Sequence, residues 1–155
     1  MRTVRHHTKD KGDLGVGHVV ADLLKAGIQP ALLLSEHLPF DLIAIAPDNT
    51  LRTVSVKFRA AKRGAVTVEL WSVWSDRHGV HKVWHGRGLY DALAVYCPDT
   101  GRVYYIRADE LPSDIKRVTL RVQPSRNNQS EGVRHAEEYA DPKRLFARRR
   151  KHMPS

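Results

Sequence analysis

Two charged residues, Asp41 and Lys57, attract attention because each lies where the surrounding sequence is apolar. Asp41 opens the apolar run at residues 42–46, and Lys57 lies within a second run, between Val56 and Phe58. A lysine in such a place either extends its charge to water or is kept for chemistry. This acid and this lysine are therefore the first candidates for a reactive site.

The two runs are predicted to be β-strands joined by a tight turn. Turn-forming residues separate them at 47–50, and apolar and β-branched residues flank that turn. Side chains alternate between two faces along a strand. One face of the second strand carries Thr53, Ser55, Lys57 and Arg59. Ser55 and Lys57 are therefore expected to face the same site.

These residues belong to a longer pattern. Pro39-Phe40-Asp41 followed by Ser55-Val56-Lys57 resembles the core of PD-(D/E)XK nucleases, where Pro-Asp precedes a turn and acid-x-lysine lies on the next strand. The likeness extends, in order, to Lys11-Gly12-Asp13-Leu14-Gly15, Leu93-Ala94-Val95-Tyr96 before Pro98-Asp99-Thr100-Gly101, Val103-Tyr104-Tyr105-Ile106, and Arg126-Asn127-Asn128-Gln129 before Tyr139. Residues 9–141 thus resemble the branch that contains homing endonucleases encoded in bacterial group I introns.

The resemblance implies a DNA endonuclease that uses Mg²⁺, with Mn²⁺ as an alternative. Phosphodiester hydrolysis needs a positioned water and relief of charge on the phosphate, and a divalent ion held by carboxylates provides both. Mg²⁺ keeps several waters, so few protein oxygen ligands suffice. By resemblance, Asp41 and the Val56 carbonyl bind the metal, and Lys57, with Ser55 beside it in the catalytic pattern, stabilises the phosphate or orients the water.

Two positions depart from the family pattern. Ser55 stands two residues before Lys57, where the family has an acid or, in this branch, often glutamine. Val16 stands where a glutamate usually follows Lys-Gly-x-x-Gly, and valine binds no metal. Asp13, one helical turn earlier, is a candidate replacement. With Asp10 as N-cap, Asp13 would instead stabilise the positive end of the helix.

Glu69 is a second candidate for the displaced acid. It lies on a predicted strand at residues 65–71. A lone glutamate on a strand also fits a solvated face of a sheet. Both interpretations remain open, as they do for Asp13.

Composition narrows the class of protein. A chain of 155 residues fits one domain, and its net charge of +9 favours a polyanionic partner such as nucleic acid. No apolar run approaches the roughly 20 residues of a membrane span. The amino terminus lacks the apolar segment of a secretory signal, so we expect a cytoplasmic protein without a membrane partner. One cysteine, Cys97, excludes an internal disulfide.

Candidate nucleic-acid contacts occur in four places. Arg59, Lys62 and Arg63 lie around a predicted hairpin turn, where they would contact phosphates. The alternative is a hairpin tip that is simply solvated. Residues 71–88 mix tryptophans with basic residues and are interpreted as a base-stacking loop, although some tryptophans also fit a core. The remaining candidates are Arg77 and Lys82 in that loop, Arg126 in a polar loop, and Arg148, Arg149 and Arg150 in a basic arm or solubilising tail.

The predicted fold class is α/β: a restriction-endonuclease-like core in a single domain, with a mixed central β-sheet flanked by helices. Apolar spacing predicts a helix over 10–26 that stops at Gly27. Further strands are expected at 31–34, 89–97, 102–107 and 117–122, and residues 109–112 are expected to begin a turn or a short helix. The family resemblance implies a small helix at 133–139. The expected divisions are a basic N-terminal segment (1–9), a nuclease-like domain (10–141) and a basic C-terminal tail (142–155).

Three functions fit these observations. The first is a Mg²⁺-dependent DNA endonuclease of the homing or resolvase type. The second is a module with the nuclease fold that binds nucleic acid with weakened or absent catalysis, which Val16 and Ser55 motivate. The third is a basic accessory protein without a site at Asp41. Because one such site cuts one strand, double-strand cleavage implies a homo-oligomer, either a dimer or a tetramer.

Overall fold

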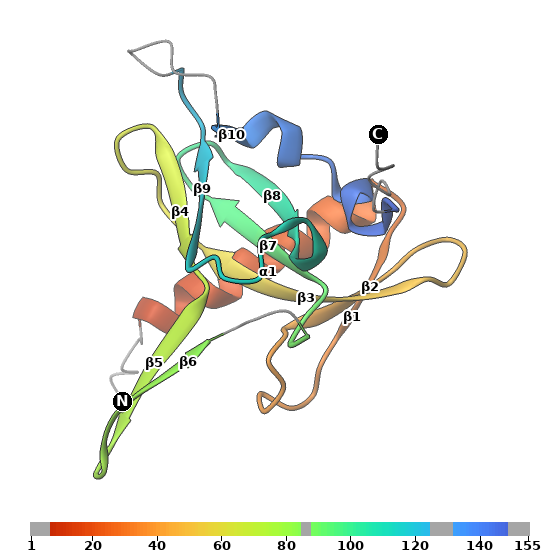
Figure 1. Ribbon diagram of the computed structural model, residues 1–155. Coiled ribbons are helices and arrows are strands. Elements are labelled where there is room, and N and C mark those ends of the chain that lie inside the picture. The colour runs from red at the N-terminus through yellow and green to blue at the C-terminus, as the bar shows by residue number, and fades with distance from the viewer. Residues whose placement is uncertain (1–6, 85–87, 125–131, 149–155) are drawn as a thin grey trace, which may run out of the picture.

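A five-stranded mixed sheet forms the centre of the computed structural model, which describes residues 7–84, 88–124 and 132–148 (Figure 1). The strand order is β1-β2-β3-β7-β8, with β3 parallel to β7 and all other neighbours antiparallel. The strands span Gln29–Leu32 (β1), Leu42–Ile45 (β2), Leu51–Phe58 (β3), Ala92–Cys97 (β7) and Arg102–Arg107 (β8). This arrangement confirms the predicted α/β class with a mixed central sheet.

Helix α1, His7–Lys25, covers one face of this sheet (Figure 1). Val19 and Leu23 of α1 are fully buried and share a core cluster with Leu42 and Val54 of the sheet. The helix stops at Gly27 as predicted, since a φ of 74° there allows the following N–H to turn back and donate to the Leu23 carbonyl at 2.9 Å.

The start of α1 differs from the prediction. The helix begins at His7, so Asp10 lies within its first turn, and the N-cap assigned to Asp10 is wrong. Asp13 is therefore the seventh helical residue, which is too far along to stabilise the free amides of the helix start. The polar residues before the apolar stripe contain no proline and continue the helix.

A second, three-stranded sheet covers the opposite face, in the order β10-β9-β4. Its strands span Ala65–Glu69 (β4), Arg117–Arg121 (β9) and Arg134–His135 (β10). Period-two alternation directs Val66 and Val68 of β4 and Val118 and Leu120 of β9 into the core between the two sheets. Helix α1 and the small sheet therefore flank the central sheet on its two faces.

The predicted hairpin of β2 and β3 is confirmed, although β2 is shorter than expected. The turn is closed by a hydrogen bond from the Ala46 N–H to the Thr50 carbonyl at 2.9 Å. Leu42, the first residue of β2, pairs with Val54 of β3. Strand β3 continues to Phe58, so its last residues extend past the end of β2 and leave one edge open.

The prediction of a loop at residues 71–88 is wrong for most of that range. Trp71–Asp76 (β5) and Gly79–Trp84 (β6) pair as an antiparallel hairpin that projects from the rest of the molecule (Figure 1). Its turn is supported by the Asp76 carboxylate, which accepts the His78 N–H at 2.7 Å. The mixture of tryptophans and basic residues concealed the β-branched and aromatic pattern of two short strands.

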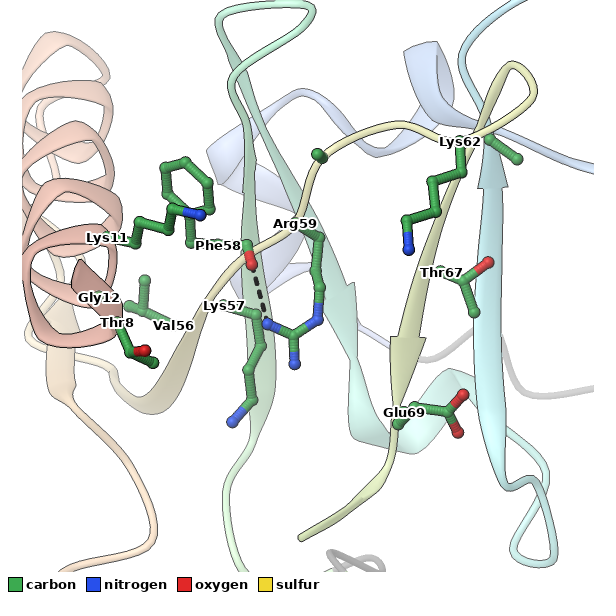
Figure 2. Close-up of a pocket in the computed structure, with 12 residues that line it drawn as sticks. Thr8, Lys11, Gly12, Val56, Lys57, Phe58, Arg59, Lys62, Thr67 and Glu69 are labelled. Atoms are coloured by element: carbon green, nitrogen blue, oxygen red, sulfur yellow. Dashed lines mark hydrogen bonds between the residues drawn. The ribbon is translucent and has the colours of Figure 1, made fainter.

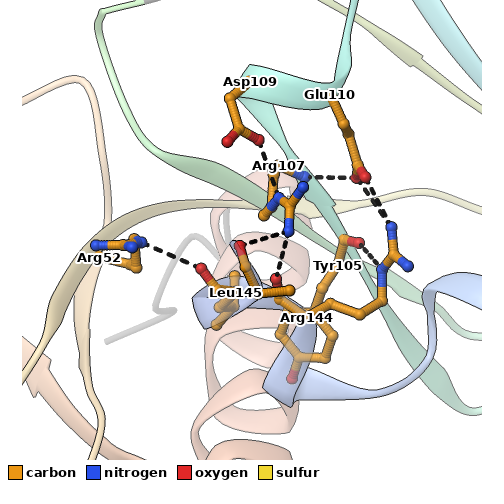
Figure 3. Close-up of polar contacts among 8 residues, drawn as sticks. Arg52, Tyr105, Arg107, Asp109, Glu110, Arg144 and Leu145 are labelled. Carbon is orange, nitrogen blue, oxygen red and sulfur yellow. Dashed lines mark hydrogen bonds and ion pairs between the residues drawn. The ribbon is translucent and has the colours of Figure 1, made fainter. Parts of the chain in front are cut away.

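Residues 142–146 form a 3₁₀ helix, η3 (Pro142–Phe146), that is fastened to the central sheet. Leu145 is fully buried, and Figure 3 shows the polar contacts around it. Arg107 donates to the Ala147 carbonyl at 2.7 Å, and Arg144 pairs with Glu110 at 2.8 Å. The folded body therefore continues past residue 141.

Two further 3₁₀ helices, η1 (Ala108–Glu110) and η2 (Ala136–Tyr139), lie close to the predicted short helices. Within the described ranges, none of the helices combines the length and apolar character that a bilayer span requires.

Candidate active site

Asp41 is fixed to β3 by two hydrogen bonds. Its N–H donates to the Val54 carbonyl at 2.9 Å, and its carboxylate Oδ2 accepts the Val56 N–H at 2.6 Å. Because regular pairing with β2 ends at Leu42, the Val56 N–H needs another acceptor. The Asp41 side chain supplies it, so this exposed carboxylate is held at the open edge of β3.

The Val56 carbonyl is directed toward the same edge. A residue in a β-strand points its N–H and C=O to one side, and its neighbours point theirs to the other. Accordingly, Arg59 donates its N–H to Tyr96 on β7, at 3.0 Å. Oxygen atoms of Asp41 and Val56 therefore lie on one side of β3, and both are of the hard type that Mg²⁺ prefers.

Lys57 is partly buried on the next position of β3. Burial lowers its pKa, the Asp41 carboxylate raises it, and the Arg59 guanidinium lowers it further. The geometric link between the two residues is the backbone of Val56, which donates its N–H to Asp41 and directly precedes Lys57.

A cleft of about 700 Å³ lies along the open edge of β3. Figure 2 shows the end of β3 and the adjoining Arg59 in its centre, α1 on one side, and β4 with the preceding turn on the other. The lining includes four basic side chains and one acidic one: Lys11, Lys57, Arg59, Lys62 and Glu69. Such a surplus of positive charge favours a bound anion.

Of the remaining candidate site residues, one lines the cleft and two do not. Glu69 lines the cleft from β4 and forms an ion pair with Arg117 at 3.6 Å. Asp13 is exposed on α1 and is not part of the cleft lining. Ser55 is 3% exposed, so its hydroxyl lies inside the fold and outside that lining. In the described parts of the chain, no three His, Cys, Asp or Glu side chains form a metal-binding group.

The candidate nucleic-acid contacts divide in the same way. Arg59 and Lys62 line the cleft, whereas Arg63 is exposed in the adjoining turn. Arg77 is exposed at the tip of the β5–β6 hairpin, and Arg148 is exposed after η3. The side chain of Lys82 and all of Arg126, Arg149 and Arg150 lie outside the described residues.

Sequence reasoning missed the contribution of α1 to the cleft, which comes from Thr8, Lys11 and Gly12. Lys11 and Gly12 belong to a segment of the family resemblance, but that segment did not predict that they would face the cleft. Thr67 on β4 also lines the cleft. The sequence could have predicted this, because Thr67 alternates with the apolar Val66 and Val68 and therefore faces away from the core in which they are buried.

Comparison with known proteins agrees with this geometry. Residues 6–142 match the PD-(D/E)XK endonuclease family. The fold is similar to the solved structure of the bacterial homing endonuclease I-Ssp6803I, with a TM-score of 0.71 and 19% sequence identity over 90% of this chain and 93% of that chain. At this identity the likeness concerns the fold. No curated protein matches the sequence.

Asp41 is not part of the cleft lining, but it is bonded to the backbone of Val56, which lines the cleft with Lys57. A mixed sheet that holds an aspartate beside a lysine in a basic cleft fits a nuclease, an enzyme that hydrolyses phosphodiester bonds. More specifically, the chain belongs to the PD-(D/E)XK endonuclease family. Members of this family generally use divalent metal ions.

Proposed function

We propose that this protein is a Mg²⁺-dependent DNA endonuclease of the homing or resolvase type, with Mn²⁺ as an alternative cofactor. One observation supports this function most directly: the Asp41 carboxylate accepts the Val56 N–H at 2.6 Å at the open edge of β3, and the next residue, Lys57, lines a cleft with a positive surplus. A module that uses its charge only for assembly has no need of a fixed carboxylate at that edge.

The donor atoms on the chain fit a divalent ion that retains most of its waters. Asp41 and the Val56 carbonyl supply two hard oxygen atoms, and Glu69 is a further carboxylate on the cleft. A bound Mg²⁺ supplies an activated water and relieves charge on the phosphate. We assign the first two oxygens to the metal, with Glu69 favoured over Asp13 as an additional ligand because only Glu69 lines the cleft.

Lys57 stabilises the scissile phosphate in this mechanism. Its charge is partly desolvated, so its attraction to a phosphate is stronger than that of a lysine in water. Arg59 and Lys62 extend the positive surface along the cleft and hold the neighbouring phosphates. Ser55 is buried, so its role is to position β3 rather than to touch the phosphate.

The remaining basic candidates are proposed as DNA contacts further from the cut. Arg63, Arg77 and Arg148 are exposed, which allows them to bind phosphates. Lys82, Arg126, Arg149 and Arg150 stay predictions from the sequence. Cleavage of both strands requires two such sites, so we propose a homo-oligomer, and light scattering with and without duplex DNA measures its size.

A plasmid-nicking assay tests this function. Wild-type protein should nick or linearise target-bearing DNA with Mg²⁺ or Mn²⁺, and EDTA should stop the reaction. Asp41→Asn and Lys57→Ala should reduce cleavage at least about a hundredfold, because each removes a charge that acts on the transition state.

Two controls make the assay specific. Asp48 also accepts one backbone N–H through its carboxylate, from Thr50 at 3.0 Å, but it lies in the β2–β3 turn at the other end of β3. Lys25 is exposed in the last turn of α1. Asp48→Asn and Lys25→Ala should both cleave like wild type. Equal loss in these controls would contradict the assignment of Asp41 and Lys57.

A second function is binding of nucleic acid without cleavage. It is favoured by buried Ser55 and by Val16, which occupy positions where the family pattern has ligands. Salt-sensitive DNA binding with no cleavage over a series of divalent ions would support it. Absence of DNA and RNA binding would contradict both functions.

A further inference from the structure

The cleft has basic side chains on both sides of β3. Lys11 comes from α1, whereas Arg59 and Lys62 come from the end of β3 and the turn that follows it (Figure 2). Lys57 lies between them on β3. A linear polyanion that reaches Lys57 must therefore pass between two positively charged sides rather than across one flat surface.

The α1 side of this cleft carries a glycine where helix formation favours other residues. Glycine is less favourable than alanine inside a helix because it loses more backbone freedom on folding. At Gly12, a Cβ atom would have no heavy atom within 4 Å. Packing inside the protein therefore does not require glycine at this position, although Gly12 lines the cleft.

Gly15 differs from Gly12 in its surroundings. A Cβ atom on Gly15 would lie 3.5 Å from Val56 Cγ1, so this residue is at the contact between α1 and β3. The two glycines lie nearly one turn apart on the side of α1 that faces β3. Gly15 therefore packs against the sheet, whereas the surface at Gly12 is open to a bound molecule.

We propose that α1, through Lys11 and the bare surface of Gly12, forms the second side of a channel that holds the phosphodiester backbone of the DNA strand being cut. Lys11 binds a phosphate next to the one at Lys57. Gly12 allows the sugar-phosphate chain to approach the helix closely. This assignment rests on the proposed DNA endonuclease function and adds α1 to the residues that position the substrate.

The first test measures the charge of the channel without relying on cleavage. Binding of fluorescently labelled duplex DNA is followed by anisotropy in EDTA over a series of salt concentrations. Removing one phosphate contact lowers the slope of log affinity against log salt by about 0.9. Lys11→Ala should show this change, while Lys25→Ala, about 21 Å further along the same helix, should not. Equal slopes for Lys11→Ala and wild type would overturn the proposal.

The second test uses two glycines as a matched pair. Gly12 and Gly17 are both exposed, neither has a neighbour within 4 Å of a Cβ position, and only Gly12 lines the cleft. Five residues separate them, which is about 140° around the helix. Gly12→Leu and Gly17→Leu should each raise the melting temperature by about 2–4 °C, because leucine is the better helix former.

The two variants should differ in function. Gly12→Leu fills the channel and should bind and nick DNA at least about tenfold less well, whereas Gly17→Leu should match wild type. Equal binding by the two variants would overturn the channel. Wild-type protein that binds DNA but never nicks it would contradict the endonuclease function alone, because the difference between the two leucine variants would still be measurable in EDTA.

Discussion

The Asp41 carboxylate accepts the Val56 N–H at 2.6 Å, across the point where β2 stops and β3 continues. This bond replaces a strand-to-strand hydrogen bond with one from a side chain. It places an anionic oxygen beside the backbone of the residue that precedes Lys57. The open edge of β3 and the position of the acid are therefore two aspects of one structural feature.

Substitution of Asp41 should separate its structural role from its chemical role. Asp41→Asn keeps an oxygen that can accept the Val56 N–H, whereas Asp41→Ala leaves that N–H without this acceptor. We expect Asp41→Ala to lower the free energy of unfolding by about 1–3 kcal/mol and Asp41→Asn to change it less. Urea unfolding followed by circular dichroism measures both.

The same variants test metal binding without an activity measurement. A ligand that binds only the folded protein raises its melting temperature. Mn²⁺ should therefore stabilise wild-type protein and should stabilise neither Asp41→Asn nor Asp41→Ala. If Asp41→Asn gains as much as wild type, Asp41 is not the metal ligand.

The positive charge of Lys57 should lower the stability of the fold while supporting cleavage, and both effects should depend on pH. Burial lowers its pKa below the usual 10.5, and this effect exceeds the opposing attraction of Asp41. The unfolded chain therefore binds the proton more tightly than the folded protein. Lys57→Met should be more stable than wild type at neutral pH, and the difference should shrink as pH rises from the lowered pKa toward 10.5.

Cleavage by wild-type protein should respond to pH in the opposite sense. It depends on the charged ammonium group in the proposed mechanism, so it should fall over the same range in which wild-type stability recovers. Melting temperatures and nicking rates measured over one pH series provide the comparison. A Lys57→Met protein that is less stable than wild type at pH 7 would contradict the assigned cost of burying this charge.

Much of the fold was predictable because local patterns specify it. The β2–β3 turn, the stop of α1 at Gly27 and strand β8 agree with turn chemistry, C-capping and apolar runs. The start of α1 and the β5–β6 hairpin were not predicted from the sequence. Polar residues hid the continuing helix, and basic residues hid the strand pattern.

The site was predictable only in part. Alternation placed Lys57 on one face of β3, and the family resemblance singled out Asp41. The open edge depends on β2 being shorter than β3, which is a matter of pairing register that the sequence did not reveal. Glu69 and Lys11 line one cleft and Asp13 does not, because the lining depends on how β4 and α1 pack beside β3, which local patterns do not specify.

Glu69 and Asp13 should therefore behave differently when neutralised. Glu69 lines the cleft, so Glu69→Gln should raise the Mg²⁺ concentration needed for half-maximal nicking by about tenfold, in line with the loss of one outer metal contact. Asp13→Asn should leave it unchanged. A titration of nicking rate against Mg²⁺ decides between them, and the reverse result would place the additional acid on α1.

The contact of Glu69 with Arg117 requires its own control. This ion pair is partly exposed, at 3.6 Å, so its loss should change stability by less than about 1 kcal/mol. Arg117→Ala removes the pair and keeps the carboxylate. It should therefore retain the wild-type Mg²⁺ requirement, and a tenfold rise in this variant would assign the effect to the ion pair.

Two truncations should test the role of η3 in the folded body. A chain ending at residue 148 keeps Leu145, whereas a chain ending at 141 loses this fully buried side chain and the contacts of Arg107 and Arg144 around it. Leu145→Ala alone should cost about 2–5 kcal/mol of unfolding free energy. Leu34→Ala is the matched control, because Leu34 is fully exposed. The chain ending at 148 should show a smaller salt slope in DNA binding than the full-length protein, because it lacks Arg149 and Arg150. The chain ending at 141 should be unfolded or strongly destabilised, and a melting temperature equal to that of the full-length protein would contradict a packed role for η3.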